Sequence, residues 1–401
     1  MASQDLVASA TSLPPAWTKL ALLSHGVHID RSFAAWFAGH PGSVRRRNFY
    51  NSPVWGHEGD VPQEIKLKTE GPPVTVAVNV YGDDTWTLRC DEQGPQVVNT
   101  RLGLTCGVSL ISDLECLQTS AALGQIANLY GGSALSFFSP RACYFFTDGT
   151  QCRFCSLAGT AADTSFANRL SPGQVREAVS AVLGAEPERI NQIMIVGGNE
   201  RNLDAGFLRH VDLAKAAAKS VAAAGMTTRV SVHLVTMPPN DLNAIEELEG
   251  VPGVHTGFNL EVWDGSLFDQ IAPGKAADYG QATILAALEK LVDVVGVYRA
   301  HSILIAGLEP AHSTVAGAAA LAEMGVSPIV NIFHSDVHSE IGLAVRPTYE
   351  ELVEVASGLS DLHAAYPIQP YWKGCGRNAL DFEAGHGMFA GEPPALGASA
   401  E

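Results

Sequence analysis

The chain reads Cys143-Tyr-Phe-Phe-Thr-Asp-Gly-Thr-Gln-Cys152-Arg-Phe-Cys155 shortly after an apolar run, Ala134–Ser139, that is typical of a buried strand. Three of the seven cysteines in the chain lie within this stretch. Three thiolates at close spacing suit a metal centre, because a folded loop can direct all three toward one place. Three is one ligand fewer than a closed tetrahedral zinc site or a fully ligated four-iron cluster holds. The stretch therefore predicts a metal centre with one position left open for chemistry.

This cysteine stretch resembles the cluster loop of the radical S-adenosylmethionine (radical SAM) superfamily, in which three cysteines hold a [4Fe–4S] cluster. The usual family spacing is three residues in the first gap and two in the second. The second gap here, Cys152-Arg-Phe154-Cys155, fits that pattern and keeps an aromatic residue before the last cysteine. The first gap has eight residues instead of three. A longer first gap enlarges the loop and leaves the number of ligands unchanged.

Four later segments resemble further radical SAM motifs, in the order in which the family has them, so the resemblance covers about Ala134 to Ser335. The first is similar to the glycine-rich motif after the second strand, with one extra residue before the acid. The second and third resemble the ends of the fourth and fifth strands, and the last resembles the sixth strand. These segments are Gly197-Gly198-Asn199-Glu200, Gly257–Asp264 with Ile271–Lys275, Ser302–Pro310 and Ile329–Ser335.

The resemblance implies two cofactors, a [4Fe–4S] cluster and S-adenosylmethionine, and an electron donor such as flavodoxin or ferredoxin. In most of the superfamily, an electron from the cluster breaks a C–S bond of S-adenosylmethionine, and the resulting 5′-deoxyadenosyl radical removes a hydrogen atom from the substrate. The cluster ligands would be Cys143, Cys152 and Cys155. The residues that would hold the cosubstrate are Phe154, Gly197, Gly198, Glu200, Asn259, Glu261 and Phe333.

Side chains near the expected strand ends are candidates for a catalytic role toward the substrate. They are His233, His301, Glu309 and His334. For each histidine, a hydrogen-bonded structural residue is the alternative interpretation. Cys375 lies in an aromatic, glycine-flanked segment, Tyr371–Arg377, that could fold over the barrel mouth. Its thiol could be a hydrogen-atom donor, a ligand or a covalent carrier, and it could equally be a small buried hydrophobe.

Beyond Ala134 the chain alternates short apolar runs with helical patterns, which predicts parallel β/α units. Six such units fit an incomplete (β/α)6 TIM-like barrel, in which chemistry occurs at the carboxyl ends of the strands. Ser171-Pro172 predicts the start of one helix, and Thr348 precedes another with acids in its first turn. The expected strands are Ala134–Ser139, Ile190–Val196, Arg229–Val235, Val254–Glu261, Val297–Ile305 and Ser327–His334.

Residues 1–130 have a different character and are expected to form an α+β accessory region, followed by the barrel core at 131–346. In the accessory region, Val74–Tyr81 and Thr85–Cys90 alternate around a glycine turn and predict a β-hairpin. Gln118–Tyr130 predicts a short helix. Residues 347–401 are expected to be a C-terminal helix and an extension that caps the substrate site, with a disordered tail past Pro394.

The composition limits the possible partners. The chain has 25 Lys and Arg against 42 Asp and Glu, a net charge of −17, which disfavours nucleic acid because phosphate binding needs a positive surface. No apolar stretch approaches the ~20 residues of a membrane span, and the first residues lack a signal-peptide pattern. An odd number of cysteines with a tight thiol cluster favours a reducing cytoplasm. We expect a small-molecule substrate, in natural-product or cofactor biosynthesis.

Alternative interpretations remain open at this stage. Radical chemistry can end in dehydrogenation, epimerisation, rearrangement or sulfur insertion, and a sulfur-inserting enzyme would need an auxiliary cluster. Cys90, Cys106 and Cys116 are the cysteines left for one, although their spacing is loose. A zinc-binding barrel without radical chemistry would use Cys143, the Cys152–Cys155 pair and one histidine.

Overall fold

The structure is a computed structural model that describes residues 11–44, 61–81, 84–162, 166–334, 338–342 and 346–396. Its centre is a curved seven-stranded sheet in which six parallel strands follow one another in chain order. A short antiparallel strand, β8, lies at one edge and pairs with β9. The strands are β8 (Asn128–Tyr130), β9 (Ala134–Phe138), β10 (Gln192–Val196), β11 (Ser231–Thr236), β12 (Val254–Phe258), β13 (Ala300–Ala306) and β14 (Ser327–Ile332).

This sheet does not close on itself, because its pairing runs from β14 to β8 as an open path. It is therefore an incomplete (β/α)6 TIM-like barrel, as the sequence predicts. The strand interiors are near-continuous apolar runs, such as Gln192–Val196, since helices cover one face and the barrel interior the other. Each of the six parallel strands is one to three residues shorter than expected, and β12 shortens the most at its carboxyl end: it ends at Phe258, and Glu261 forms an isolated bridge with Leu304 instead.

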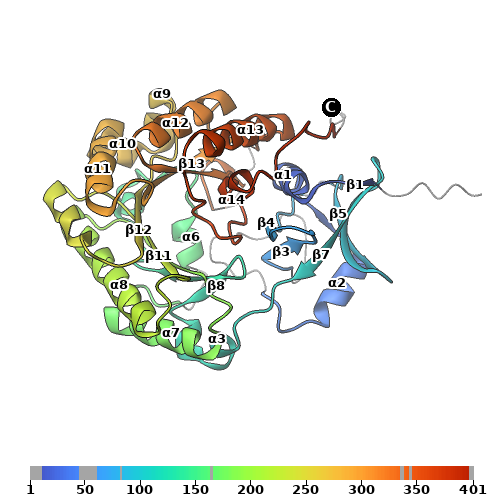
Figure 1. The fold of residues 1–401 in the computed structure, drawn as a ribbon, viewed down its shortest axis with the longest axis horizontal. Helices are drawn as coiled ribbons and strands as arrows, with labels where there is room; N and C mark the ends of the chain where they lie inside the picture. Colours follow the sequence, from blue (N-terminus) through green and yellow to red (C-terminus); the bar gives the residue numbers. More distant parts are fainter. Residues whose placement is uncertain are drawn as a thin grey trace, which may run out of the picture.

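The long helices surround the outside of the curved sheet (Figure 1). Ser171 and Thr348 each form a capping box at the start of the predicted helices. The helices of the core and the C-terminal part are α5 (Tyr144–Asp148), α6 (Leu157–Ala162), α7 (Pro172–Ala185), α8 (Leu203–Ala223), the 3₁₀ helix Leu242–Leu248, α9 (Gly265–Ile271), α10 (Pro273–Asp278), α11 (Gly280–Val295), α12 (Ala311–Glu323), α13 (Tyr349–Ala365) and α14 (Asp381–Gly385).

The N-terminal region forms a second seven-stranded sheet with the order β2-β5-β6-β7-β3-β4, and β1 pairs with β7. Figure 1 shows it beside the barrel, on the right of the view. Its elements are β1 (Thr11–Ser12), α1 (Pro15–His25), β2 (His28–Ile29), α2 (Arg31–Ala38), β3 (Glu64–Leu67), β4 (Val74–Ala77), β5 (Thr87–Asp91), β6 (Gly94–Asn99), β7 (Leu104–Leu110), α3 (Glu115–Thr119) and α4 (Ala121–Gly124).

Two sequence expectations in this region were wrong. The strands at Val74–Tyr81 and Thr85–Cys90 do not form a hairpin: β4 pairs with β3, and β5 pairs with β6. The hairpin that β5 does form turns at Glu92 and Gln93, between β5 and β6, and the expected turn at Gly82 and Asp83 lies outside the described residues. The helix expected at Gln118–Tyr130 breaks at Ser120 and gives way to β8.

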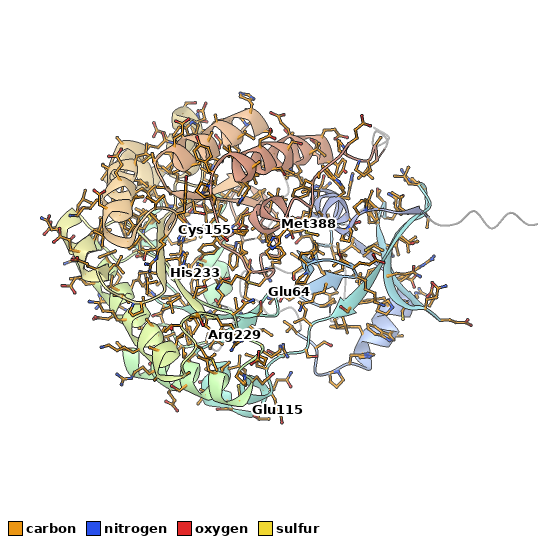
Figure 2. The ribbon with its side chains drawn as sticks, in the orientation of Figure 1. Glu64, Glu115, Cys155, Arg229, His233 and Met388 are labelled. Atoms are coloured by element: carbon orange, nitrogen blue, oxygen red, sulfur yellow. The ribbon has the colours of Figure 1, made fainter. Side chains whose placement is uncertain are left out.

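The C-terminal extension connects the two sheets through buried charged groups. Lys19 of α1 donates hydrogen bonds to Glu383 at 2.8 Å and to the carbonyl of Gly376 at 2.6 Å. Arg377 lies 2.8 Å from Glu64 of β3, which Figure 2 labels between the barrel and the N-terminal sheet. All four charged side chains are at most 2% exposed, so each pair compensates charges that would otherwise be buried alone.

Two further observations complete the fold. The tail expected to be disordered past Pro394 lies outside the described residues beyond 396. Among the described residues, no helix has both the length and the apolar character needed to cross a bilayer.

Candidate active site

A cavity of about 350 Å³ lies at the carboxyl ends of the parallel strands. Two of the cluster-loop cysteines, Cys143 and Cys155, are part of its wall, as are most of the side chains that the sequence motifs single out. Apolar side chains form a belt around it, among them Phe138, Met194 and Ile305. The polar and sulfur-containing lining residues include Cys143, Cys155, Arg141, Asn199, Asn259, Glu261, Lys275, Asn331, His334, Arg377 and Asn378.

The long first gap of the cysteine loop is occupied by a single helical turn, α5. It begins directly after Cys143 and ends at Gly149, whose left-handed φ of 69° turns the chain back. Gly149 follows Asp148 in the turn, and the backbone N–H of Thr150 then donates to Phe145 O at 2.8 Å. A second turn, in which Cys155 N–H donates to Cys152 O at 2.9 Å, completes the loop. The extra residues therefore form a local turn within the loop, and Cys143 and Cys155 still lie close enough to act electrostatically on Cys152.

The three thiols share one electrostatic environment. Burial raises the pKa of Cys143, raises that of Cys155 to about 12, and raises that of Cys152. The ammonium of Lys275 acts in the opposite direction on all three, because a nearby cation favours thiolates. Within the described residues, no group of three or more His, Cys, Asp and Glu side chains is arranged to hold a single metal ion.

Gly197 and Gly198 allow the end of β10 to lie against the cysteine loop. A Cβ on Gly197 would be 2.2 Å from Ser139 O, and one on Gly198 would be 2.3 Å from Ala142 O and 2.8 Å from the Cβ of Cys143. Neither distance is tolerable for a side chain, so only glycine fits at these positions. Both glycines line the cavity.

The loop after β12 carries a buried ion pair in the cavity wall. The Nζ of Lys275 lies 2.9 Å from Glu261 Oε1 and 3.0 Å from the carbonyl oxygen of Asn259. Burial alone would lower the pKa of Lys275, but the carboxylate of Glu261 and the nearby thiolates raise it overall. Glu261 adopts a left-handed φ of 71°, uncommon for a residue other than glycine. The Asn259 side chain accepts a hydrogen bond from Ile303 N–H at 3.3 Å.

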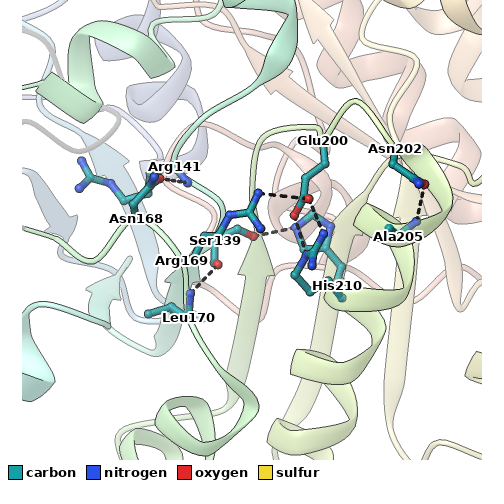
Figure 3. A network of polar contacts seen from close by, with 10 residues as sticks. Ser139, Arg141, Asn168, Arg169, Leu170, Glu200, Asn202, Ala205 and His210 are labelled. Carbon is teal, nitrogen blue, oxygen red and sulfur yellow. Dashed lines mark hydrogen bonds and ion pairs between the residues drawn. The ribbon is translucent and has the colours of Figure 1, made fainter.

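Glu200 lies apart from the other predicted cosubstrate residues. The described residues that line the cavity include its neighbour Asn199 but not Glu200 itself. Its carboxylate pairs with Arg209 at 2.7 Å and with Arg169 at 3.2 Å (Figure 3). With the extra residue in the glycine motif, it is Asn199 that lines the cavity, while the acid pairs with the two arginines.

The aromatic candidates and His334 lie where the sequence predicts them. Phe154, Phe333 and His334 all line the cavity. The Nδ1 of His334 is 3.4 Å from Asn378 Nδ2. The side-chain oxygen of Asn378 is buried without a hydrogen-bond partner. This end of the cavity therefore offers polar groups from both β14 and the C-terminal extension.

Three other candidates lie outside the wall of this cavity. Cys375 is fully buried, is absent from the described cavity wall, and donates to Gln192 Oε1 at 3.4 Å. Burial raises the pKa of its thiol to about 12. His233 and His301 lie near the amino ends of their strands, so the expectation that they gather at the carboxyl ends was wrong.

Glu309 holds the loop after β12 in place. Its carboxylate accepts hydrogen bonds from the backbone N–H groups of Trp263 at 3.0 Å and Asp264 at 2.8 Å. It also accepts hydrogen bonds from the hydroxyls of Ser313 and Thr314. All its acceptor positions thus face protein donors, which is the arrangement of a structural carboxylate.

Sequence reasoning missed several cavity residues. Lys275 belongs to the motif segment Ile271–Lys275, but the sequence did not identify it as the partner of Glu261. Tyr130 lines the cavity from β8, the antiparallel edge strand, and was not predicted as a site residue. Tyr371, Trp372 and Arg377 line it from the C-terminal segment that the sequence indicated could fold over the barrel mouth, although none of them was singled out there as a site residue.

No family model matches the chain. A stretch of 130 residues is 29% identical to the bacteriochlorophyllide c C-7(1)-hydroxylase of Chlorobaculum limnaeum, and the match covers 32% of this chain. It also covers 32% of that protein, so the chain spans about a third of the length of the curated relative that it matches.

Among solved structures, the chain is similar to a radical SAM methyltransferase from Sphaerobacter thermophilus, with 13% identity, a TM-score of 0.42, and coverage of 73% of this chain and 79% of that one. It is also similar to methylornithine synthase (PylB), with 13% identity, a TM-score of 0.41, and coverage of 61% of this chain and 68% of that one. The proteins to which the chain is similar thus include a radical SAM enzyme.

Proposed function

We propose that this protein is a radical SAM enzyme that holds a [4Fe–4S] cluster on Cys143, Cys152 and Cys155 and binds S-adenosylmethionine in the cavity at the carboxyl ends of the barrel strands. The observation that carries the proposal is the shared cavity wall. Cys143 and Cys155 line the same cavity as Gly197, Gly198 and the strand-end residues that resemble the family's cosubstrate site.

The residues present fit such a cluster. Thiolates are the protein ligands of iron–sulfur clusters, and each cysteine binds a different iron, so three sulfurs need not converge on one point as they would around a single ion. The lack of a single-ion arrangement among the described residues is consistent with this and gives no support to the zinc alternative. When bound, such a cluster supplies an electron that breaks a C–S bond of S-adenosylmethionine and produces a carbon radical.

The protein's own residues supply position and charge. The closely packed Gly197 and Gly198 leave backbone exposed at the cavity, where a polar cosubstrate can approach. The Lys275 ammonium, held between Glu261 and the Asn259 carbonyl, favours thiolates in the neighbouring loop. The carboxylate of Glu261 lines the cavity and is already neutralised by Lys275, so it adds a hydrogen-bond acceptor without an uncompensated charge.

The remaining wall supports a small organic substrate. The apolar belt excludes water and offers few groups that could react with a radical, whereas Asn378, His334 and Arg377 provide polar contacts at the far end. A cavity of this size and lining suits a compact substrate with an apolar body and a polar end. We infer hydrogen abstraction from such a molecule, in natural-product or cofactor biosynthesis. Dehydrogenation, epimerisation, rearrangement and sulfur insertion are the candidate outcomes.

The experiment is anaerobic reconstitution followed by incubation with S-adenosylmethionine and dithionite, with products identified by mass spectrometry. We expect 5′-deoxyadenosine from the wild-type chain and none from Cys152→Ala. A colourless protein that contains zinc in place of iron and sulfide would overturn the proposal, and so would an iron-loaded protein that leaves S-adenosylmethionine intact. Methylthioadenosine as the product would show cleavage at a different C–S bond and would contradict the hydrogen-abstraction step.

A further inference from the structure

A second cavity, of about 430 Å³, lies at the amino ends of the barrel strands. Its wall contains Ser231, His255, His301 and Ser327, each the first or second residue of its strand, together with His233 of β11. The cysteine loop follows the carboxyl end of β9, so the two cavities belong to opposite ends of the parallel sheet. The C-terminal extension closes this second cavity with Gln369, Pro370, Tyr371, Trp372, Lys373, Phe382 and His386.

Aromatic and imidazole rings form the inner wall. The rings of His233 and His255 stack with centroids 4.8 Å apart and nearly parallel planes. The ring of Tyr371 contacts that of His233 edge-on, with centroids 4.1 Å apart. It also contacts the ring of His301 at a tilt, with centroids 4.5 Å apart. Tyr371 and Trp372 also line the first cavity, so these two rings form a partition between the two spaces.

Hydrogen-bonding groups in this wall are left without partners. Nδ1 of His233, both ring nitrogens of His301, the hydroxyl of Tyr371 and Nε1 of Trp372 are buried and make no hydrogen bond to the described protein. All four side chains are at most 5% exposed. Leaving one such group unpaired costs about 1–3 kcal/mol, so this concentration of them is unusual for a wall with a structural role alone.

The charged groups around the cavity are mostly basic. None of the described lining residues is an aspartate or a glutamate, whereas Lys373 belongs to the wall. Arg299 lies close enough to act on His255. The indole N–H of Trp372 and the ammonium of Lys373 can only donate hydrogen bonds. A ligand that pairs with these groups must therefore carry several hydrogen-bond acceptors. A negative charge on the ligand would be stabilised by the basic side chains.

We propose that the cavity at the amino ends of β11–β14 binds a small oxyanion of the sulfate, phosphate or carboxylate type. Imidazole N–H groups of His233 and His301, the Tyr371 hydroxyl and the Lys373 ammonium are its donors. This site is independent of the radical chemistry proposed above, because it shares with the first cavity only the Tyr371–Trp372 partition.

A metal cation fits this wall less well. Histidines are common metal ligands, but no group of three or more candidate ligands among the described residues is arranged to hold an ion. A cation would also have to enter beside Lys373 and Arg299 without a carboxylate to offset its charge. An oxyanion fits the wall better on both counts. It is attracted by the basic groups, and it accepts hydrogen bonds from the unpaired N–H and O–H groups.

Anion binding should be coupled to proton uptake. Burial lowers the pKa of His233 and His301 well below its ordinary value, and burial together with Arg299 and Lys373 lowers that of His255 to about 4. An anion favours the imidazolium form, so binding should strengthen as pH falls. The other titratable groups that face this cluster are Tyr298, Tyr371, Lys373, Asp381 and His386.

Asp381 is an acid of the extension that acts on Tyr371 in this wall. One of its oxygens accepts a hydrogen bond from Trp372 N–H at 2.9 Å, and burial raises the pKa of its carboxyl to about 7. The Asp381 carboxyl is therefore largely protonated in the pH range where the histidines would gain protons. Its electrostatic repulsion of a bound anion is weakest at the lower pH.

The test is isothermal titration calorimetry of the full chain with sodium sulfate at constant ionic strength, at about pH 6 and about pH 8. Sulfate keeps its charge across this range, so any pH effect comes from the protein. We expect saturable binding that is at least about fivefold tighter at the lower pH, with net proton uptake shown by the dependence of the heat on buffer. Titrations with phosphate and with propionate then separate the tetrahedral oxyanions from carboxylates.

Two variants make the test specific. Lys373→Met and Tyr371→Phe each remove one donor and keep the bulk of the side chain, and each should weaken sulfate binding at least about fivefold. Lys215→Met, on the outer surface of α8, removes an equal charge and should leave binding unchanged. Absence of saturable binding in the folded wild type, or equal affinities for all three variants, would overturn the proposal.

Discussion

The Nζ of Lys275 lies 2.9 Å from Oε1 of Glu261 in the wall of the first cavity, next to the three-cysteine loop. Both side chains are nearly buried, with 7% and 12% of their surfaces exposed. The pair joins the loop after β12 to α10 and places one positive charge near the thiols. A buried pair of this kind is costly to break, because the remaining charge stays in a medium of low dielectric constant.

Lys275→Met should lower the amount of cluster that the protein retains. The variant removes the cation that favours thiolates and leaves the carboxylate of Glu261 uncompensated beside them. We expect the iron content after reconstitution to fall to about half or less, together with a loss of stability of about 3 kcal/mol. Lys215→Met is the matched control, since its exposed pair with Glu247 at 2.7 Å should contribute little. Equal iron contents in the two variants would contradict this role.

Gly198→Ala should prevent the cysteine loop from closing on β10. The added Cβ would lie 2.3 Å from Ala142 O, so either the strand end or the loop must move. Loss of most of the bound iron is the expected result, measured after purification without oxygen. Gly184→Ala in α7 is the control, because no atom lies within 4 Å of the new methyl group and alanine favours a helix. Full iron content in Gly198→Ala would show that the close approach is unnecessary.

The six parallel strands and the cysteine loop are the features that the sequence alone predicts. Apolar runs such as Ile193–Ile195 predict buried strands because both faces are covered, and capping residues such as Ser171 and Thr348 predict helix starts. These are local signals, which a single sequence carries. The order of motifs then brings the strand ends together, since parallel strands share one edge.

What the sequence could not reveal depends on contacts between distant segments. The predicted hairpin after Val74 failed because β4 pairs with the earlier β3, and nothing local distinguishes that partner from β5. The sequence likewise carries no signal that Glu200, a predicted cosubstrate residue, pairs with Arg169 and Arg209. One inserted residue is enough to change which side chain reaches the cavity, because it turns the next side chain toward a different face.

Glu309→Gln should destabilise the fold. The amide has only one acceptor oxygen and would place an NH₂ group against N–H donors of Trp263 or Asp264. A loss of about 2–3 kcal/mol in the free energy of unfolding is expected from denaturant titration. Glu323→Gln, exposed at the end of α12, should change stability little. If Glu309→Gln instead keeps wild-type stability and abolishes turnover, a catalytic role would replace the structural one.

Asp381→Asn should stabilise the protein at alkaline pH and not at acidic pH. Burial raises the pKa of this carboxyl from 3.8 to about 7, so the folded state keeps a proton that the unfolded state releases. The wild-type chain therefore loses stability as pH rises from about 4 to 7, whereas the amide can still accept the hydrogen bond from Trp372 without titrating.

The measurement for Asp381 is the difference in melting temperature between wild type and variant at about pH 5 and about pH 8. We expect the variant to gain a few degrees on the wild type between the two conditions. A difference that stays constant with pH would mean that the carboxyl titrates alike in the folded and unfolded states.

The central claim is that Cys143, Cys152 and Cys155 together hold one iron–sulfur cluster, and iron analysis of anaerobically reconstituted variants tests it most directly. We expect about four irons per wild-type chain, near-complete loss with alanine at any one of the three positions, and full retention in Cys375→Ala, whose thiol lies outside the cavity wall. A wild-type protein without iron, or a Cys143→Ala variant with a full complement, would contradict the account.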